Sequence, residues 1–550
     1  MKRFLGFISR EIVSINHAAY ILALSSISSQ VLALIRDRLL ASSFGASFNL
    51  DLYYSAFRIP DILFATVGSL VSASVLLPTI ASNLNKDKKD LKDFINSIFT
   101  FYSLLIFLSS IVLFFLSPYI LALIFPKISG DDFSTLVSLT RILFLSPIFL
   151  GFSNLFACIV QTNQRFFISA LSPVLYNVGI ILGILFLFPL FGLKGLVLGV
   201  VLGAFLHFAI QIPFVVKTGL FPNFSLTFSS AVKKVLKISV PRTITVSSAE
   251  MSELFLISFA SFLSVGSISI FNLSFNLQSV PFSIIGVSYA VAVFPTLSKI
   301  FSSGHREEFF EKILKTSKYI VLWSVPSIFL IFIFRFEIVK ILLGTGRFDS
   351  LAISLTSATF AIFAMSLVFQ NLNLLFTRSF YARGQTARPL VISVLGAFFI
   401  IISSFFFANL FDTNTLFKNI ILSVFNLSSE NGIKVLTLGL GYSFGTFVTF
   451  ILYSVFINKE YKGFFVGVIK YILAIIVASV FSSIVLFSIN LKQYFNETFL
   501  SILIYLIISF LIFSASFILF LSFIKNIELK ELQSSFMSKF KKKDIPENRV

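Results

Sequence analysis

The sequence predicts an all-α polytopic membrane protein with about 14 transmembrane helices. Of the 550 residues, 57% are hydrophobic and 12% are charged, and the mean hydropathy is +0.97. Soluble domains carry about 25% charged residues, so half that share indicates that lipid is the main solvent of this chain. The hydrophobic residues form long continuous runs, whereas the strands of an outer-membrane barrel alternate hydrophobic and polar residues. The predicted spans are therefore helices.

Each expected span is close to or longer than the ~20 residues that a helix needs to cross a bilayer. In chain order the stretches are 18–40, 52–84, 95–126, 136–162, 166–191, 195–217, 238–265, 267–298, 316–344, 350–382, 389–411, 433–457, 463–490 and 498–524. The first stretch leads into Arg36, Asp37 and Arg38 instead of a small-residue cleavage site. We therefore expect a retained helix there and not a signal peptide.

Basic residues are concentrated in every second connecting segment. These segments are 2–10, 86–92, the turn at Arg165, 217–237, 299–318, 383–388, 459–462 and the tail from Lys525 to Arg549. The other segments hold isolated basic residues, namely Lys127, Lys194, Arg347, Lys418, Lys434 and Lys492. The positive-inside rule then places both termini in the cytoplasm, in agreement with an even number of spans. We expect a multi-pass protein of the inner (plasma) membrane.

Several function classes are excluded by composition. The net charge of +19 is spread over short segments between spans, which favours contact with membrane lipids and argues against a nucleic-acid partner. A single cysteine, Cys158, excludes an internal disulfide, and the three histidines lack the spacing of metal ligands. The sequence has no phosphate-binding loop and no nucleophile motif. We expect no enzyme activity, no metal and no cofactor.

Two short segments recur at nearly the same offset along the chain. Leu77–Ile80 resembles Phe294–Leu297, and Gln161–Ile168 resembles Gly384–Val391. Six expected spans separate the partners, an even number, so the two halves would have the same orientation in the membrane. This pattern predicts two parallel six-helix lobes followed by two extra C-terminal helices. The predicted domains are 1–225, 226–458, the pair of spans in 459–525 and a basic tail at 526–550.

Polar and ionisable residues inside the spans are the candidate functional residues, because charge at membrane depth is costly. On five spans from both halves they form helical stripes that include Arg36, Asp51, Arg58, Arg242, Glu250, Glu253, Asn272, Asn276, Gln370 and Asn373. This distribution predicts a water-filled cavity between two lobes. The alternative for the uncharged residues is hydrogen bonding between helices. Glu250 and Glu253 could couple transport to a cation or a proton, or form a structural salt bridge with a partner such as Arg242.

Several segments resemble the MurJ (MviN) lipid II flippase family, a branch of the multidrug/oligosaccharidyl-lipid/polysaccharide exporter superfamily. The segments are LTRILFLSPIFLGFSNLFACIVQTNQRFFISALSPVLYNVGIILG (Leu139–Gly183), FGASFNLDLYYSAFRIPDIL (Phe44–Leu63), LLGTGRFD (Leu342–Asp349), RSFYARGQTARPLV (Arg378–Val391) and FNLQSVPFSIIGVSYAVAVFPTLSK (Phe275–Lys299). The resemblance implies two six-helix lobes around a cationic cavity, with two extra helices shaping a groove for a lipid tail. It implies a monomeric transporter that moves lipid II, an undecaprenyl-pyrophosphate-linked disaccharide-peptide, by alternating access.

The resemblance also assigns site residues. Arg36 and Asp51 lie where the family keeps a cavity arginine and a first-loop aspartate, and Arg58 occupies a position that is often basic. Three other cavity arginines of well-studied members are replaced here, by Gln30, Phe64 and Asn276. The cavity is therefore expected to be less positive than in relatives. Arg242 is our candidate for partial compensation from the cytoplasmic side.

Three alternatives to lipid II transport remain open at this stage. The missing arginines allow export of another polyprenyl-linked oligosaccharide. A cation-coupled drug antiporter of the same superfamily would be expected to have twelve spans. A membrane scaffold or receptor without transport would lack polar stripes shared between two repeats. The sequence does not distinguish membrane potential, sodium and protons as the driving force.

Overall fold

The computed structural model describes residues 15–71, 76, 88–163, 166–225, 230–427, 430–524, 526 and 530–531. Every secondary-structure element in this part of the chain is helical, as the composition predicts. Pro78 and Arg165, which belong to the expected repeat, and most of the predicted tail at 526–550 lie outside the described residues.

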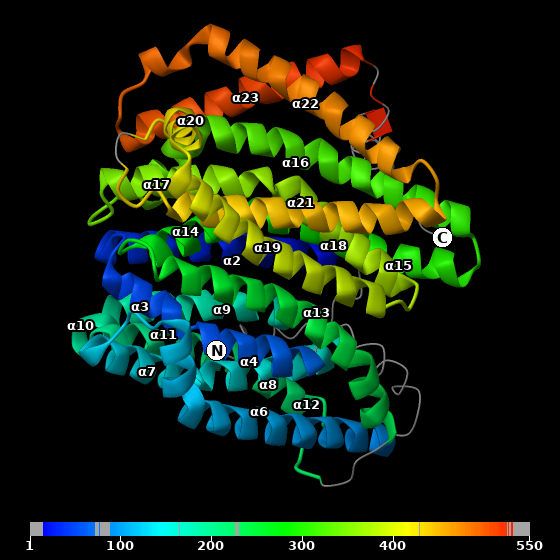
Figure 1. Ribbon diagram of the computed structural model, residues 1–550. Helices are drawn as coiled ribbons and strands as arrows, with labels where there is room; N and C mark the ends of the chain where they lie inside the picture. Colours follow the sequence, from blue (N-terminus) through cyan, green and yellow to red (C-terminus); the bar gives the residue numbers. More distant parts are fainter. Residues whose placement is uncertain are drawn as a thin grey trace, which may run out of the picture. The chain divides into compact units, whose positions relative to one another are not determined.

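The chain divides into two compact units, each assembled from segments that are distant in sequence (Figure 1). The first unit comprises 1–273, 342–356 and 386–441, and the second comprises 274–341, 357–385 and 442–550. Helices of the first unit are α2 (Ile15–Phe44), α3 (Phe48–Ala56), α4 (Arg58–Val67), η1 (Gly68–Val71), α6 (Lys88–Ile124), α7 (Gly130–Leu143), α8 (Leu145–Thr162), α9 (Phe166–Leu182), η2 (Gly183–Leu187), α10 (Phe188–Phe191), α11 (Leu193–Ala209), α12 (Ile212–Lys217), α13 (Ser230–Ala260), α19 (Ala387–Thr413) and α20 (Thr415–Phe425).

The remaining helices belong wholly or partly to the second unit. Those wholly within it are η3 (Ser283–Val287), α15 (Ser288–Ser302), α18 (Leu367–Ala382), α22 (Phe464–Ile489), η4 (Leu491–Tyr494) and α23 (Phe499–Phe523). Those shared with the first unit are α14 (Ser267–Phe282), α16 (Arg306–Leu343), α17 (Ser350–Met365) and α21 (Val435–Glu460). The first unit contains α13, α19 and α20 in addition to residues 1–225, and the predicted domain ranges stay a prediction.

Nine helices in the described part of the chain are long and apolar enough to cross a membrane, and the bent pair α17 and α18 would be a tenth. The remaining expected stretches are 18–40 on α2, 52–84, whose described part up to residue 71 forms α3, α4 and η1, 238–265 on α13 and 316–344 on α16. These helices carry most of the ionisable residues that the sequence singles out. The chain is thus an all-helical polytopic membrane protein, and the count of fourteen spans stays a prediction.

Glycines allow α9 and its π-helical extension η2 to pack directly against α11. Gly179 faces the backbone of Gly203, and Gly183 faces the backbone of Gly199. A Cβ atom at any of these positions would overlap the backbone of the opposite helix. Small residues at such contacts let membrane helices approach closely and gain van der Waals contact, which is the main source of helix association in lipid.

Replacement of Gly199 by valine is expected to lower the free energy of unfolding by about 1–3 kcal/mol, because overpacking forces the two backbones apart. Thermal unfolding of the purified protein in detergent micelles measures the change. Gly467→Ala is the matched control, since a Cβ there meets only Leu314 Cδ1 at 3.5 Å, an ordinary contact distance. Equal unfolding temperatures for Gly199→Val and the wild type would contradict the close packing described here.

Candidate functional site

Arg58 is the buried centre of a polar cluster in the first unit. It begins α4, and its side chain is 8% exposed. Its guanidinium Nη1 donates to Glu253 Oε1 of α13 at 2.7 Å, and Nη2 donates to Asn272 Oδ1 of α14 at 3.4 Å. Nε donates to the Tyr54 carbonyl at 3.3 Å. The planar fork of arginine can satisfy three acceptors at once in this way, which a lysine ammonium would do less well.

Carboxylates surround the cavity next to this arginine. A cavity of about 350 Å³ is lined by Asp61, Phe64, Ala65, Gly68, Asn154, Val246, Glu250 and Glu253. Asp61 Oδ2 lies 3.7 Å from Arg58 Nη2, one helical turn along α4. Arg58 contacts two of the three carboxyl groups, those of Asp61 and Glu253, so the three carry more negative charge than one guanidinium balances when all are ionised. This local charge differs from the cationic cavity that the resemblance implies, and Phe64, at a position where relatives carry a cavity arginine, lines the wall.

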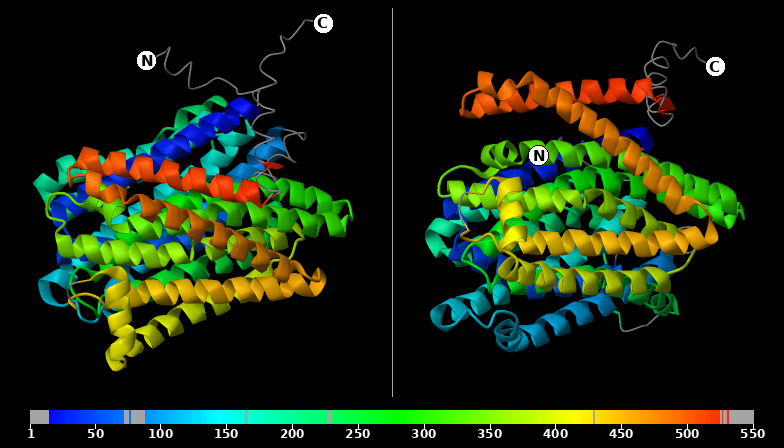
Figure 2. Two further views of the ribbon diagram at one scale, coloured as in Figure 1. Left: turned by 90° about the horizontal axis from the view of Figure 1, so that it is seen from above. Right: turned by 45° about the horizontal axis from the view of Figure 1, so that its top comes forward.

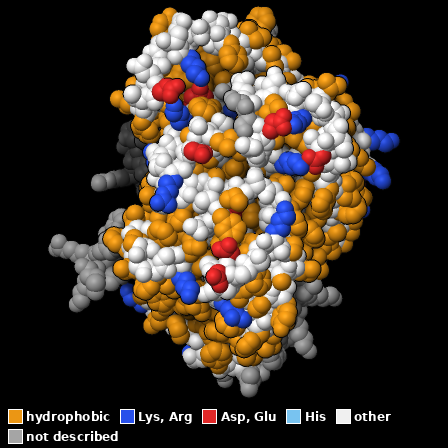
Figure 3. Space-filling view, turned by 60° about the vertical axis from the view of Figure 1, so that its left-hand side comes forward, with side chains coloured by type: hydrophobic (Ala, Val, Ile, Leu, Met, Phe, Trp, Pro, Cys, Tyr) orange, Lys and Arg blue, Asp and Glu red, His pale blue; other side chains and the backbone are white. Residues whose placement is uncertain are grey.

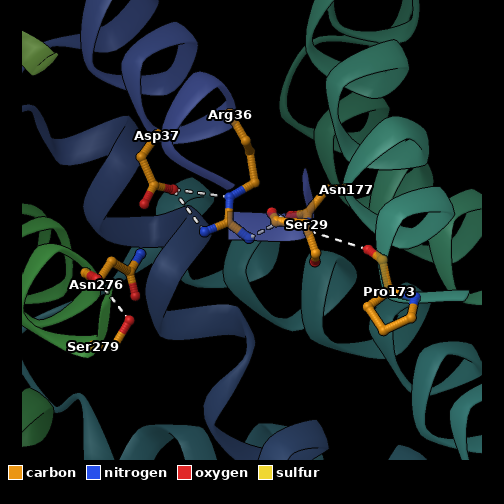
Figure 4. Close-up of polar contacts among 7 residues, drawn as sticks. All are labelled: Ser29, Arg36, Asp37, Pro173, Asn177, Asn276 and Ser279. Atoms are coloured by element: carbon orange, nitrogen blue, oxygen red, sulfur yellow. Dashed lines mark hydrogen bonds and ion pairs between the residues drawn. The ribbon is translucent and has the colours of Figure 1, made fainter. Parts of the chain in front are cut away.

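Arg36 forms a second polar cluster in the same unit, between α2 and α9 (Figure 4). Its Nε and Nη2 contact Asp37 Oδ1 at 2.8 and 2.7 Å, and its Nη1 donates to Asn177 Oδ1 at 3.3 Å. Asn177 Nδ2 donates in turn to Ser29 Oγ at 3.2 Å and to the Pro173 carbonyl at 3.2 Å. The Arg36 side chain is 19% exposed.

Asp51 holds the beginning of α14. Its Oδ2 accepts a hydrogen bond from the Gly266 backbone N–H at 2.7 Å. Its Oδ1 accepts from the Ser269 backbone N–H at 2.8 Å and from Ser269 Oγ at 2.6 Å. A carboxylate in this place satisfies unpaired donors of the first helical turn and complements the positive end of the helix dipole. The structure therefore gives the buried Asp51 a structural contact that the sequence did not predict.

Three loops meet at the same end of the first unit, around Gly45, Gly266 and Gly346. Each of these glycines has a positive φ, at 65°, 87° and 62°. Each faces the backbone of another segment: Gly45 faces Arg347, Gly266 faces Ala46, and Gly346 faces Ser42 in the last turn of α2. The Arg347 N–H also donates to the Ser42 carbonyl at 2.9 Å. The loops that follow α2, precede α14 and follow α16 are thus interlocked through their backbones.

The remaining predicted site residues are Gln30, Asn276 and Arg242. Gln30 is half-buried on α2, directly after Ser29 of the Arg36 cluster. Asn276 belongs to the second unit, and its carbonyl accepts from Ser279 Oγ at 2.7 Å (Figure 4). Arg242 lies on α13, but its side chain is outside the described residues. The structure adds Asp61, Asn154 and Asn177, of which Asp61 was identifiable from its i,i+3 spacing to Arg58.

A model of the lipid II flippase MurJ family matches residues 40–508 of the chain. The chain belongs to this family. Among curated relatives, the lipid II flippase MurJ of Burkholderia cenocepacia is 27% identical, with 66% of this chain and 73% of that protein aligned. The probable lipid II flippase MurJ of Rickettsia prowazekii is 25% identical over 82% of this chain and 85% of that protein. The resemblance found in the sequence is thereby confirmed.

Solved structures show the fold of the family and its superfamily. A lipid II flippase MurJ in an inward closed conformation has a TM-score of 0.72 and 22% identity, covering 92% of this chain and 98% of that one. An inward-facing multidrug resistance transporter of the MATE family has a TM-score of 0.60 and 14% identity, covering 79% and 96%. The multi-pass membrane architecture is confirmed. Family membership also agrees with the prediction of a transporter and not an enzyme, and it disfavours the drug antiporter.

Proposed function

We propose that this protein moves lipid II from the cytoplasmic to the periplasmic leaflet by alternating access, for cell-wall synthesis. The observation that carries the proposal is the family match over residues 40–508. This range contains the Arg58 cluster, Asp51 and the three glycine loops, whereas Ser29, Arg36 and Asp37 of the second cluster precede it. Moving a pyrophosphate through a bilayer requires cationic hydrogen-bond donors that replace water, and arginine supplies them in bidentate geometry.

The proposed topology has fourteen spans with both termini in the cytoplasm of a cell with an inner membrane. The ten apolar spans together with α2, the α3–α4 segment, α13 and α16 support this number. The proposed domains are a first lobe at 1–225, a second lobe at 226–458, a lipid-tail pair at 459–525 and a tail at 526–550. The concentration of basic residues in alternate connecting segments supports the orientation.

Arg36 is the proposed headgroup ligand because its side chain is 19% exposed, whereas that of Arg58 is 8% exposed. Asp37 and Asn177 fix its orientation and leave donor capacity for a pyrophosphate oxygen. Gln30 lies on the same helix, and Arg242 and Asn276 are proposed as further contacts. Arg58 and Asp51 are proposed to act by positioning helices, because each already has several partners. A monomer suffices for these roles.

The acidic cavity is the proposed place of ion coupling. Glu250 and Glu253 line it together with Asp61, which extends the predicted pair to three carboxyl groups. Arg58 neutralises part of this charge through Glu253 at 2.7 Å. A proton or a monovalent cation entering the cavity would reduce the remaining repulsion among the carboxylates. Membrane potential could contribute as well, since moving one charge through 100 mV is worth about 2.3 kcal/mol.

The interlocked loops support alternating access. By the orientation proposed above, the loops at Gly45, Gly266 and Gly346 lie on the periplasmic side, so their backbone contacts close that side of the first unit. Outward release of a substrate would require these contacts to separate. Backbone contacts mediated by glycine are short and leave no large side chain to rearrange, which suits a closure that forms and breaks repeatedly.

Complementation tests the proposed substrate. The resident lipid II flippase of a bacterium is depleted while this chain is expressed, and growth and the appearance of periplasmic lipid II are followed. Rescue of both is the expected result. Failure despite full membrane expression would overturn lipid II as the substrate. The second candidate, another polyprenyl-linked oligosaccharide, is supported by the missing cavity arginines, one of which is replaced by Phe64 in the wall of this cavity.

Arg36→Ala is expected to lower the rate of lipid II translocation at limiting substrate by about 10- to 100-fold. This factor corresponds to the free energy of one hydrogen bond to a charged group. Arg36→Lys is expected to retain part of the rate, because it keeps the charge but loses the fork. Translocation is measured as accessibility of lipid II to an external probe. Unchanged rates in Arg36→Ala would remove Arg36 from the headgroup site.

A further inference from the structure

The short helix α20 has three different faces. Leu416, Ile420 and Val424 are spaced i, i+4, i+8 and form one stripe, and their side chains are 75%, 59% and 46% exposed. Asn419 and Ser423 form a parallel exposed stripe of polar side chains. Phe417 and Phe425 lie toward the protein, where Phe425 is buried. A helix with an apolar stripe, a polar stripe and a protein-facing stripe is typical of the boundary between lipid and water.

The inner face of α20 is firmly attached to the end of α19. The Phe417 ring stacks on Phe407 at 6.2 Å between centroids and packs edge-on against Phe411 at 5.3 Å. Asn414 Oδ1 caps the helix by accepting from the Phe417 N–H at 2.9 Å. The exposed stripe of Leu416, Ile420 and Val424 is therefore held in place by the protein.

The direction of α20 differs from that of the spans beside it. In Figure 1 the helix is seen almost end-on, whereas α19 runs across the view, and Figure 2 shows the same crossing from above. α19 is a candidate span of 27 residues, and α20 begins two residues after it ends. A helix that turns sharply at the end of a span lies along the membrane surface.

The exposed stripe continues a lipid-facing surface. On α19, Phe398, Ile402, Phe405 and Phe406 are 56%, 47%, 55% and 59% exposed. Phe406 is next to Phe407, whose ring contacts α20. Three side chains are far fewer than the 20–30 residues per partner of a stable protein interface, so a second copy of the chain is a poor match for this stripe.

Charged residues surround the polar side of α20. Lys418 pairs with Glu430, and Lys434 Nζ lies 2.6 Å from Asp412 Oδ1. These four residues line a cavity of about 240 Å³ together with residues 431–433. Figure 3 shows a face of the molecule on which acidic and basic side chains lie side by side among hydrophobic ones. Paired charges of this kind are stable at the headgroup level, where water is present.

We propose that α20 is an interfacial helix that lies in the outer leaflet, with Leu416, Ile420 and Val424 at the boundary between headgroups and acyl chains. Asn419 and Ser423 face the headgroups and water. The lipid contact fixes the depth of the α19 terminus and of the charged segment 412–434. The choice of the outer leaflet rests on the orientation proposed above, and the interfacial position of α20 does not depend on the identity of the transported substrate.

Fluorescence quenching in liposomes tests the placement of α20. Full-length Ile420→Cys and Asn419→Cys proteins are each labelled with an environment-sensitive fluorophore. The native Cys158 is fully buried. The wild type is treated with the same fluorophore, and its fluorescence gives the background signal. Phospholipids with a nitroxide near the headgroup serve as the lipid quencher, and iodide serves as the aqueous quencher. We expect the lipid quencher to act at least threefold more strongly at position 420 than at 419, and iodide to show the reverse order.

Two outcomes would overturn the proposal. Strong iodide quenching at both positions, with no effect of the lipid quencher, would place α20 in water. Protection of position 420 from both quenchers would mean that a protein surface, such as a second copy of the chain, covers the stripe. Unchanged thermal unfolding of both variants shows that labelling has not altered the fold.

Discussion

Arg58→Leu is expected to abolish growth rescue and to lower the free energy of unfolding by about 3 kcal/mol. Removing the guanidinium leaves Glu253 without its 2.7 Å partner and Asp61 without its 3.7 Å neighbour, next to a cavity with a third carboxyl group at Glu250. Breaking one side of a buried ion pair typically costs 3–5 kcal/mol, and the value is reduced here because the Glu253 side chain is 24% exposed. Thermal unfolding in detergent and growth under flippase depletion are the two measurements.

A double variant separates the structural role of Arg58 from its role in transport. Arg58→Leu combined with Glu253→Leu replaces the pair by hydrophobic residues of similar size, which is often neutral for stability. We expect stability close to that of the wild type and no rescue of growth. Arg141→Leu is the matched control: this arginine lies over the Phe114 ring at 4.6 Å and is not part of the cluster. If the double variant rescued growth, the ion pair would have no function beyond folding.

The ends of the most hydrophobic helices could be predicted from sequence. The expected spans 389–411, 463–490 and 498–524 coincide within a few residues with α19, α22 and α23. Each residue of such a run contributes independently to the free energy of transfer from lipid to water. Local composition is therefore sufficient to locate the ends of these helices. The interruptions could not be predicted in this way. The π-helical turns η2 and η3 each contain one more residue than a regular α-helical turn. The extra residue does not change the composition of a hydrophobic run, so hydropathy does not reveal it.

Single candidate site residues were easier to select from the sequence than the residues that contact them. Arg36, Arg58 and Glu253 stand out in sequence because charge is rare within membrane spans. Glu253, however, pairs with Arg58, 195 residues away, whereas the sequence suggested Arg242 on the same helix. Such a contact depends on how helices pack, and hydropathy carries no information about neighbours. The same reason explains why Asn177, the partner of Arg36 on α9, was not identified.

Asp51 illustrates a different limit of sequence reasoning. It was predicted to contact substrate because placing a charged aspartate within the membrane has a high free-energy cost. Its cost is offset by three hydrogen bonds from Gly266 and Ser269 at the beginning of α14. A helix N-terminus supplies such donors without any signature in the residues that provide them, since the donors are mainly backbone N–H groups.

Asp51→Ala is expected to open the interlocked loops as well as to destabilise the protein. The substitution leaves the Gly266 and Ser269 N–H groups without their buried acceptor, and hydrogen bonds to a charged group contribute about 1.5–3 kcal/mol each. Because Gly266 also faces the Ala46 backbone, its displacement loosens the contact between the loops after α2 and before α14. We expect a loss of about 2–4 kcal/mol in the free energy of unfolding.

The opening is measured by labelling Ala46→Cys with a membrane-impermeant maleimide in intact cells. In the Asp51→Ala background the labelling rate should rise at least fivefold. Asp349→Ala is the matched control, since Asp349 accepts one hydrogen bond from the Ala352 N–H at 2.8 Å at the start of α17 and is exposed. Loss of such an exposed cap costs about 1 kcal/mol and should leave the labelling rate unchanged. Equal labelling rates of Ala46→Cys alone, with Asp51→Ala and with Asp349→Ala would show that Asp51 stabilises α14 without holding the loops closed. The glycine contacts alone would then keep the loops closed.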